Sequence, residues 1–195
     1  MGLRSISLAL ASLGAAMLLS GCFLKPEHEE DEPLREGLDV RVGAIDYNVF
    51  ITRELNLALP DDRTYYKGRE AKPGFSYYGV FLEACNRSDE DPELEDGSYE
   101  TTDRFEIVDT QGNVYEPVEL PEENDFAYHA KELVQGECIP ATGSLAQLGP
   151  TGGAMLLFEL PLAAGENRPL ELEIIGEESD PIAGKREKGL VELDL

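Results

Sequence analysis

The sequence is poor in cationic residues, and this shortage excludes the partners that a cationic surface would attract. Only 16 Lys and Arg stand against 40 Asp and Glu in 195 residues, which gives a net charge of −24. A surface of this sign repels phosphate backbones and anionic head groups. We therefore expect no nucleic-acid partner.

Histidine is also scarce, which leaves little for acid–base or metal chemistry. His28 lies in an acidic run near the N-terminus, and His129 is the other histidine of the chain. Nucleophilic catalysis needs a nucleophile, a base and an orienting group, and a zinc site needs three or four converging ligands. The sequence has no Gly-x-Ser-x-Gly elbow and no phosphate-binding loop of the Gly-x-x-x-x-Gly-Lys-Ser/Thr form. We expect no enzyme activity and no cofactor.

Long apolar runs are missing except at residues 6–19, which follow a single basic residue and end in small residues. This is the pattern of a secretory signal, and the run is shorter than the roughly 20 residues of a membrane span. Residues 19–22 (Leu-Ser-Gly-Cys) resemble the lipobox of bacterial lipoproteins. The resemblance implies a signal peptide over 1–21 and a lipid anchor on Cys22 outside the cytoplasm. An uncleaved membrane anchor is the alternative.

Removal of this signal would leave 15 Lys and Arg against 40 Asp and Glu, a net charge of −25. Residues 23–37 are dense in Glu, Asp and Pro and have no sustained apolar period. Such composition predicts a disordered acidic tether, so we assign 22–37 to the lipidated cysteine and tether and 38–195 to one folded domain. Because no polybasic patch is present, membrane attachment would come from the lipid alone.

Three cysteines are an odd number for an exported protein, where a leftover thiol needs an explanation. Assigning Cys22 to lipid leaves Cys85 and Cys138 as an even pair in an oxidising compartment. We predict a disulfide between them, which would stabilise the fold by roughly 4 kcal/mol in the chain-entropy model. Two unrelated buried thiols are the alternative.

Short runs of β-branched, aromatic and alternating apolar residues predict strands in the folded region. The expected strands are 38–42, 44–52, 75–86, 105–108, 114–118, 154–160, 170–174 and, as a closing edge strand, 190–195. The continuous apolar character of 75–86 is typical of a strand buried on both faces, and Gly79 within it indicates a bulge or a close approach of neighbouring backbone. About seven to nine strands without a long helix predict an all-β, antiparallel sandwich; a barrel fits the same spacing.

Two stretches between these strands carry candidate binding residues. Tyr65 and Tyr66 lie in a long polar loop over 60–74, and tyrosine is favoured at binding surfaces, so we take them as contact candidates. The acidic loop 88–100 is a weak calcium candidate because oxygen-rich loops can hold calcium. Its possible ligands are Asp89, Asp91, Glu93 and Asp96. Their spacing does not match an EF-hand, and a solvated acidic loop is the simpler interpretation.

Three sequence blocks together support a family resemblance. They are YYGVFLEACN (residues 77–86), FEIVDTQGNVYEP (105–117) and AMLLFELP (154–161). In this order, behind a lipobox, they resemble the Ig-like domains of unknown function in bacterial surface lipoproteins. Some of these carry a telomeric-repeat-binding-factor-like label, and others are called immunoprotective extracellular antigens. The resemblance implies a β-sandwich outside the membrane without established chemistry; it does not imply DNA binding.

The expected function is therefore a lipid-anchored, non-enzymatic Ig-like module that acts through contacts with a protein or a cell-envelope polymer. The alternative is a small-ligand or calcium-binding lipoprotein that serves a transporter. A filled sandwich would favour the first, and an apolar pocket with convergent polar groups would favour the second.

Overall fold

The computed structural model describes residues 32–88, 90, 94, 97–180 and 185–195. Within these residues there are thirteen strands, of which seven have four residues or more. Three short helices connect them: α1 (Pro60–Tyr65), α2 (Leu145–Leu148) and the 3₁₀ helix η1 (Leu162–Glu166). No helix in this part of the chain is long and apolar enough to cross a bilayer.

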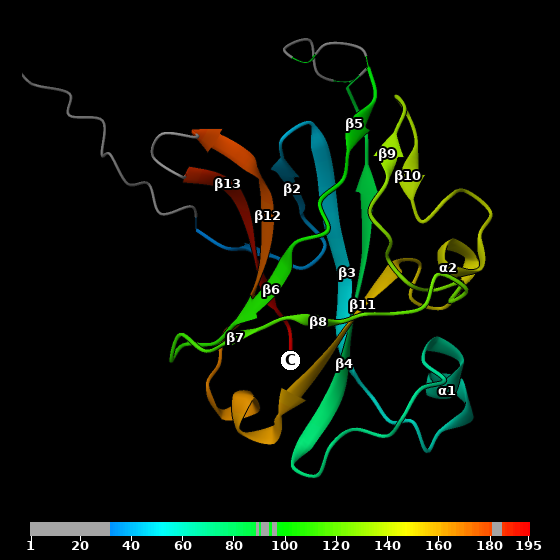
Figure 1. Ribbon diagram of the computed structural model, residues 1–195, viewed down its shortest axis with the longest axis vertical. Helices are drawn as coiled ribbons and strands as arrows, with labels where there is room; N and C mark the ends of the chain where they lie inside the picture. Colours follow the sequence, from blue (N-terminus) through cyan, green and yellow to red (C-terminus); the bar gives the residue numbers. More distant parts are fainter. Residues whose placement is uncertain (1–31, 89, 91–93, 95–96, 181–184) are drawn as a thin grey trace, which may run out of the picture. The chain divides into compact units, whose positions relative to one another are not determined.

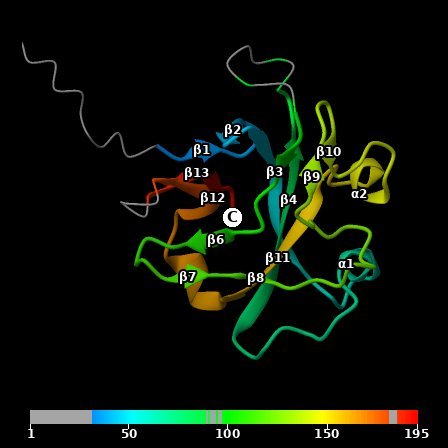
Figure 2. The same ribbon diagram turned by 45° about the horizontal axis from the view of Figure 1, so that its top comes forward.

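Two sheets form the body of the fold (Figures 1 and 2). The five-stranded sheet has the order β1 (Leu34–Arg35), β13 (Lys185–Leu193), β12 (Leu170–Asp180), β6 (Phe105–Val108) and β7 (Val114–Tyr115). The six-stranded sheet has the order β2 (Asp39–Val42), β3 (Ile45–Leu55), β4 (Phe75–Cys85), β11 (Ala154–Pro161) and β8 (Pro117–Val118), with β10 (Cys138–Ile139) beside β4. A third pair consists of β5 (Tyr99–Glu100) and β9 (Glu132–Leu133).

The main hydrophobic core lies between the two sheets. Alternate side chains of β2, β3, β4 and β11 meet those of β6, β12 and β13 in one buried cluster. Tyr47, Phe105 and Phe158 are among its largest members, each at most 2% exposed. All pairings between the strands of four or more residues are antiparallel. The predicted fold class, an antiparallel β-sandwich, is confirmed.

The predicted central strand is also confirmed, because β4 is buried on both faces. Val80 and Leu82 point into the main core, whereas Tyr77 and Phe81 belong to a second cluster on the outer face. Gly79 lies on that outer face, where an added Cβ would meet the Phe81 ring at 2.8 Å. The close approach at Gly79 is therefore made by a side chain and not by backbone as expected.

The hairpin expected around Gly112 is present, but its second strand differs from the prediction. Gly112 has a φ of 77°, and the carboxylate of Asp109 accepts hydrogen bonds from the backbone N–H of Gln111 and Asn113. Burial alone would raise the pKa of Asp109, but these bonds and those from the Asn113 and Asn167 side chains outweigh it and hold the pKa well below its usual range. The run 114–118 then divides at Glu116, so that β7 ends in one sheet and β8 begins in the other.

Two predictions for the ends of the chain are wrong: the boundary between tether and domain, and the edge position of the last strand. The strand β1 pairs with Val191 and Glu192 of β13, and the Glu36 carboxylate accepts hydrogen bonds from the N–H groups of Thr52 and Asp194. Residues 34–37 therefore belong to the folded domain and not to a disordered tether. The predicted closing strand 190–195 is likewise not at the edge of the sheet, because β1 pairs with the outer side of β13 at Val191 and Glu192.

Candidate binding surface on the six-stranded sheet

The outer face of the six-stranded sheet presents five cross-strand rows of side chains. Their register is Arg41–Asp46–Cys85–Cys138, then Asp39–Asn48–Glu83, then Ile51–Phe81–Met155, then Arg53–Gly79–Leu157–Val118, and last Leu55–Tyr77–Glu159. The first two rows, with Arg87 two residues beyond the end of β4, form what we call the polar half. The last three rows form the covered half.

The covered half lies beneath α1 and its flanking segments, which pack on it as a second hydrophobic cluster. Tyr65, the last residue of α1, is 5% exposed and meets Phe81 and Phe126 edge-on at centroid distances of 5.0 and 4.9 Å. The prediction that Tyr65 is a surface contact residue is therefore wrong. Tyr66 is half-buried, with its ring 5.2 Å from that of Tyr77.

Residues 60–74, which the sequence predicted as a loop, contain the helix α1. Pro60 and two acidic residues suit the first turn of a helix.

Two charge clamps fix this cover to the sheet. Arg69 donates to both oxygens of Glu159 at 2.7 and 2.6 Å, and the Lys72 N–H donates to the same carboxylate at 2.8 Å. The hydrogen bonds from Arg69 lower the pKa of Glu159 to about 2. In the other clamp, Arg53 donates to the buried Asp62 of α1 at 2.6 Å. The loop 66–74 and α1 are thus each held by an arginine–carboxylate pair.

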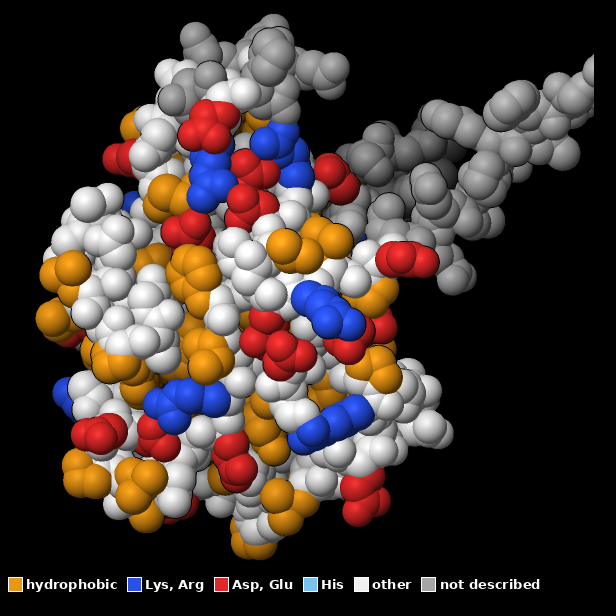
Figure 3. Space-filling view, turned by 180° about the vertical axis from the view of Figure 1, so that it is seen from behind, with side chains coloured by type: hydrophobic (Ala, Val, Ile, Leu, Met, Phe, Trp, Pro, Cys, Tyr) orange, Lys and Arg blue, Asp and Glu red, His pale blue; other side chains and the backbone are white. Residues whose placement is uncertain are grey.

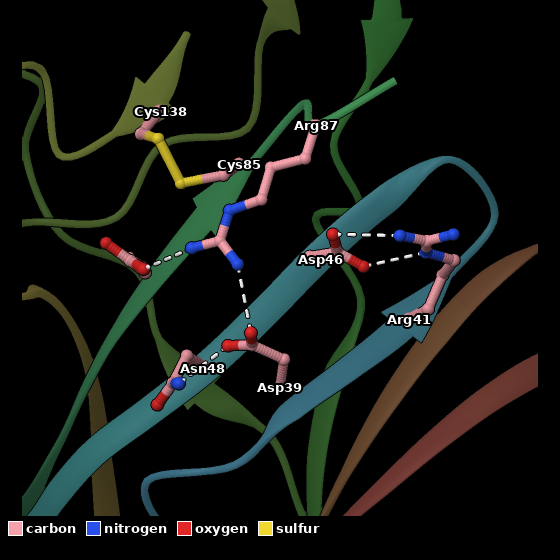
Figure 4. A network of polar contacts seen from close by, with 8 residues as sticks. Asp39, Arg41, Asp46, Asn48, Cys85, Arg87 and Cys138 are labelled. Carbon is pink, nitrogen blue, oxygen red and sulfur yellow. Dashed lines mark hydrogen bonds and ion pairs between the residues drawn. A yellow bond between two sulfur atoms is a disulfide. The ribbon is translucent and has the colours of Figure 1, made fainter. Parts of the chain in front are cut away.

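Among the described residues, no such layer lies on the polar half, where two groups of ion pairs extend over three strands (Figure 4). Arg41 donates to both oxygens of Asp46, at 2.7 and 3.0 Å. Arg87 bridges Asp39 at 2.9 Å and Glu83 at 3.0 Å. The side chains of Arg41 and Arg87 remain 39% and 31% exposed. Seen from behind, the upper part of the described surface carries cationic and anionic side chains side by side (Figure 3).

The predicted disulfide is present and lies at the end of the first row of the polar half. Cys85 and Cys138 are bonded directly across the β4–β10 pair, with their Cα atoms 4.1 Å apart. The following residue, Asn86, is fully buried and donates from its side chain to the carbonyls of Gly97 and Leu133, each at 2.9 Å. The end of β4 is therefore fixed covalently and by hydrogen bonds at the start of the acidic loop.

Apolar side chains accompany the polar half at its boundary with the covered half. The register of β3 shifts between Val49 and Ile51, so one extra residue, Phe50, is inserted. Phe50 and Ile51 are 37% and 40% exposed. Exposed aromatic and aliphatic groups thus lie on β3 at the boundary between the two halves, on the strand whose Asp46 pairs with Arg41.

The other predicted residues are distributed differently. Cys22 and the calcium candidates Asp89, Asp91, Glu93 and Asp96 lie outside the described residues. His129 is exposed. Within the part of the chain that the structure describes, no group of three or more His, Cys, Asp or Glu side chains could hold a metal ion.

Among the described residues, two of the clefts lie between the sheets. The larger, of about 1100 Å³, lies where the β2–β3 turn, residues 98–104 and parts of β12 and β13 meet. Tyr47 is at its base, and its hydroxyl accepts a hydrogen bond of 2.8 Å from the Thr102 N–H. Burial raises the pKa of Tyr47. The smaller cleft, of about 690 Å³, lies between β6 and β8.

Sequence reasoning did not single out Arg41, Asp46 or Arg87. The sequence does contain part of the information needed to find them. The alternation of 38–43 assigns Asp39 and Arg41 to one solvent-facing side of a strand. Alternation does not give the partner strand or the register. The meeting of Arg41 with Asp46, and of Arg87 with Asp39, required the structure.

The chain has few similarities to known proteins. No family model matches the sequence, and no curated protein matches it. Among solved structures, the yjhA protein of Bacillus subtilis aligns with a TM-score of 0.45 at 12% identity, over 83% of this chain and 99% of that one. An uncharacterized β-sandwich protein of Clostridium difficile 630 aligns with a TM-score of 0.45 at 12% identity, over 87% and 99%.

Proposed function

We propose that this chain is a lipid-anchored, extracytoplasmic, non-enzymatic binding module of the kind found in Ig-like domains of bacterial surface lipoproteins. The Leu-Ser-Gly-Cys sequence at 19–22 supports the anchor, because it combines a signal-like leader with a cysteine at the cleavage position. The Cys85–Cys138 disulfide supports export, because such bonds persist in oxidising compartments. A location outside the cytoplasm would suit both features.

The observation that carries the binding role is the contrast between the two halves of one sheet face. Among the described residues, the covered half is protected by α1 and its flanking segments, whereas the polar half presents the partly exposed Arg41 and Arg87, with the exposed Phe50 and Ile51 at its boundary. Arginine and aromatic residues are enriched at protein interfaces and among the residues that dominate binding energy. We therefore assign the contact with a protein or an envelope polymer to the polar half.

The ion pairs of the polar half would prepare it for binding. Arg41 is held by two hydrogen bonds to Asp46, and Arg87 by one bond each to Asp39 and Glu83. Side chains that are already fixed lose less conformational freedom when a partner binds. A partner that reaches these arginines would meet a preformed surface and not a mobile one.

The binding role can be tested with the chain anchored on cells. After chemical crosslinking, captured partners would be compared for the original chain, for Arg41→Ala with Arg87→Ala, and for Lys188→Ala. Lys188 is a matched control because it pairs with Glu173 on the other sheet. We expect the double variant to lose the captured species and Lys188→Ala to retain it. Equal capture by all three would remove the polar half as the contact surface.

The anchor can be tested separately by growing cells with a clickable fatty-acid analogue. The proposal predicts labelled protein in the membrane fraction and loss of both label and membrane association in Cys22→Ala. Label on the Cys22→Ala chain, or no label on the original chain, would contradict the anchor. This result is independent of the binding surface, because it concerns the N-terminal residues alone.

The cleft of about 1100 Å³ supports a second candidate, a lipoprotein that binds a small ligand or calcium. Its volume is slightly above that of typical ligand sites, which is roughly 300–1,000 Å³. Charged side chains such as Glu100, Asp103 and Arg104 line it together with Tyr47. A thermal melt in chelator and in excess calcium tests the calcium form of this candidate. A raised melting temperature in calcium would favour it, and unchanged melting would exclude it.

A further inference from the structure

The helix α2 and the loops on either side of it lie in the longest uncharged segment of this acidic chain. Residues 138–158 contain no Lys, Arg, Asp or Glu. Residues 154–158 are buried in β11, whereas most of residues 141–150 are exposed to solvent. We call residues 141–150 the neutral loop. It lies at the periphery of the fold in both ribbon views (Figures 1 and 2), and the corresponding side of Figure 3, on the left, is mostly uncharged.

The helix α2 has its apolar side chains facing outward. Ala146 is its buried residue, whereas Leu145 and Leu148 are 59% and 74% exposed. Leu148 is the most exposed large apolar side chain in the described part of the chain. A helix that packs on a protein core turns its leucines inward. Because residues three positions apart lie on one side of a helix, these two leucines form a single projecting apolar surface.

Hydrogen bonds hold the neutral loop in this conformation. The Ser144 hydroxyl accepts a hydrogen bond from the Gln147 N–H at 3.3 Å, and the Gln147 side chain accepts one from the Gly143 N–H at 2.5 Å. The disulfide at Cys138 precedes the loop, and β11 follows it. The two leucines are thus kept in solvent by an ordered turn of helix. Since exposed leucines add nothing to the core, their position indicates a contact outside the chain.

The chemistry of the neutral loop suits the surface of a lipid bilayer. A carboxylate is repelled by anionic head groups and loses hydration at the interface, and this segment has none. Leucine side chains gain free energy when they move from water to the boundary of the acyl chains. The proposed anchor would bring that boundary close, because the stretch from Cys22 to Leu34 spans at most about 40 Å when extended.

We propose that the neutral loop docks on the bilayer that carries the anchor, with Leu145 and Leu148 at the boundary between head groups and acyl chains. This inference rests on the proposed lipid anchor and adds which side of the domain faces the membrane. The lipid supplies the attachment, and the two leucines set the orientation. A second copy of this chain is a poorer occupant, because two chains of net charge −24 repel each other. The contact proposed for the polar half is separate, and each can fail alone.

The test uses the full chain on vesicles of phosphatidylcholine and phosphatidylglycerol. The chain is held there by its own lipid or, if cells leave Cys22 unmodified, by coupling the Cys22 thiol to a maleimide lipid. Cys85 and Cys138 do not compete for the maleimide, because they are bonded to each other. Failure of the natural anchor therefore leaves this test intact. The chain contains no tryptophan, so a single tryptophan placed at the exposed Pro150 reports on the neutral loop alone.

We expect Pro150→Trp to emit at shorter wavelength on the vesicles and to be quenched by lipids brominated on their acyl chains. The control is Val114→Trp, at a position 54% exposed on the other sheet, which should keep the emission it has in solution. Leu145→Ser with Leu148→Ser should remove most of the quenching of Pro150→Trp. Because both leucines are exposed, this change should leave the fold intact.

Equal quenching of the tryptophans at positions 150 and 114 would overturn the proposal, because it would show no preferred orientation. Absence of quenching at both would overturn it too, and would leave the neutral loop to a protein partner. Undiminished quenching in the serine background would also contradict the proposal, since tryptophan itself favours the bilayer interface and would then account for the signal.

Discussion

The two halves of the outer face of one sheet have opposite chemistry although the same strands, β3 and β4, build both. In the covered half, Tyr77 and Phe81 are packed under α1 and each is at most 1% exposed. In the polar half, Asp46 and Glu83 pair with arginines that remain partly exposed to solvent. The difference teaches that one strand can be packed over part of its length and partly open to solvent over the rest, and it is this open part that we propose for recognition.

The largest loss of stability is expected for a substitution of Phe81 in the covered half. Phe81→Ala would remove a fully buried ring that packs against Tyr65, and such truncations cost about 3–5 kcal/mol. Urea unfolding followed by circular dichroism measures the change in the free energy of unfolding. The matched control is Phe50→Ala at the exposed bulge, for which we expect less than about 1 kcal/mol. Similar losses for the two variants would contradict the distinction between the halves.

Removal of the disulfide at the end of the polar half should give the next largest loss of stability. Cys85→Ala with Cys138→Ala should destabilise the fold by about 4 kcal/mol, because the cross-link closes a long loop in the unfolded chain. Unfolding of the original chain under reducing conditions should show a similar loss. If neither treatment lowers the unfolding free energy, the bond would not constrain the unfolded chain.

Loss of the Glu159 carboxylate, which holds Arg69 and Lys72, should lower the free energy of unfolding by a smaller amount that depends on pH. Its pKa is about 2 in the folded state against an ordinary 4.5, so its contribution is fully present above about pH 4.5 and is lost as the pH falls towards 2. Glu159→Gln should therefore cost about 1–3 kcal/mol at pH 7 and little near pH 2. Unfolding curves at several pH values measure this, with the exposed Glu187→Gln as control. A difference between Glu159→Gln and the original chain that does not change with pH would contradict the clamp.

The smallest effect on stability is expected in the ion pairs of the polar half. Arg41→Ala should change the free energy of unfolding by about 0.2–1 kcal/mol, because the pair with Asp46 is partly solvated. Thermal unfolding in low and high salt measures this change, which should shrink as salt screens the pair. A loss of several kcal/mol would mean that the polar half is a structural network.

The sequence predicted the strands well because their local pattern reflects burial. Residues 75–86 are apolar on both faces, and β4 is indeed buried on both. The disulfide followed from the number of cysteines once Cys22 was set aside. Gly112 was predicted at a turn that needs positive φ, and its φ is 77°.

The rest could not be predicted because it depends on contacts between distant segments. The alternation of β2 and β3 assigns Arg41 and Asp46 to a face but gives no register, and register decides whether they pair. Tyr65 was expected at the surface because its neighbours are polar. Its burial results from α1 folding back onto β4, which the polar sequence of 60–74 does not indicate.

The most direct test of the central claim is site-specific photocrosslinking on cells. A benzoylphenylalanine would replace Ile51, which is 40% exposed beside the polar half, or Val114, which is 54% exposed on the other sheet. The account predicts that Ile51 gives a discrete crosslinked species that disappears when Arg41 and Arg87 are also changed to alanine, and that Val114 does not give it. The same species from both positions, or its persistence in the alanine background, would contradict the claim.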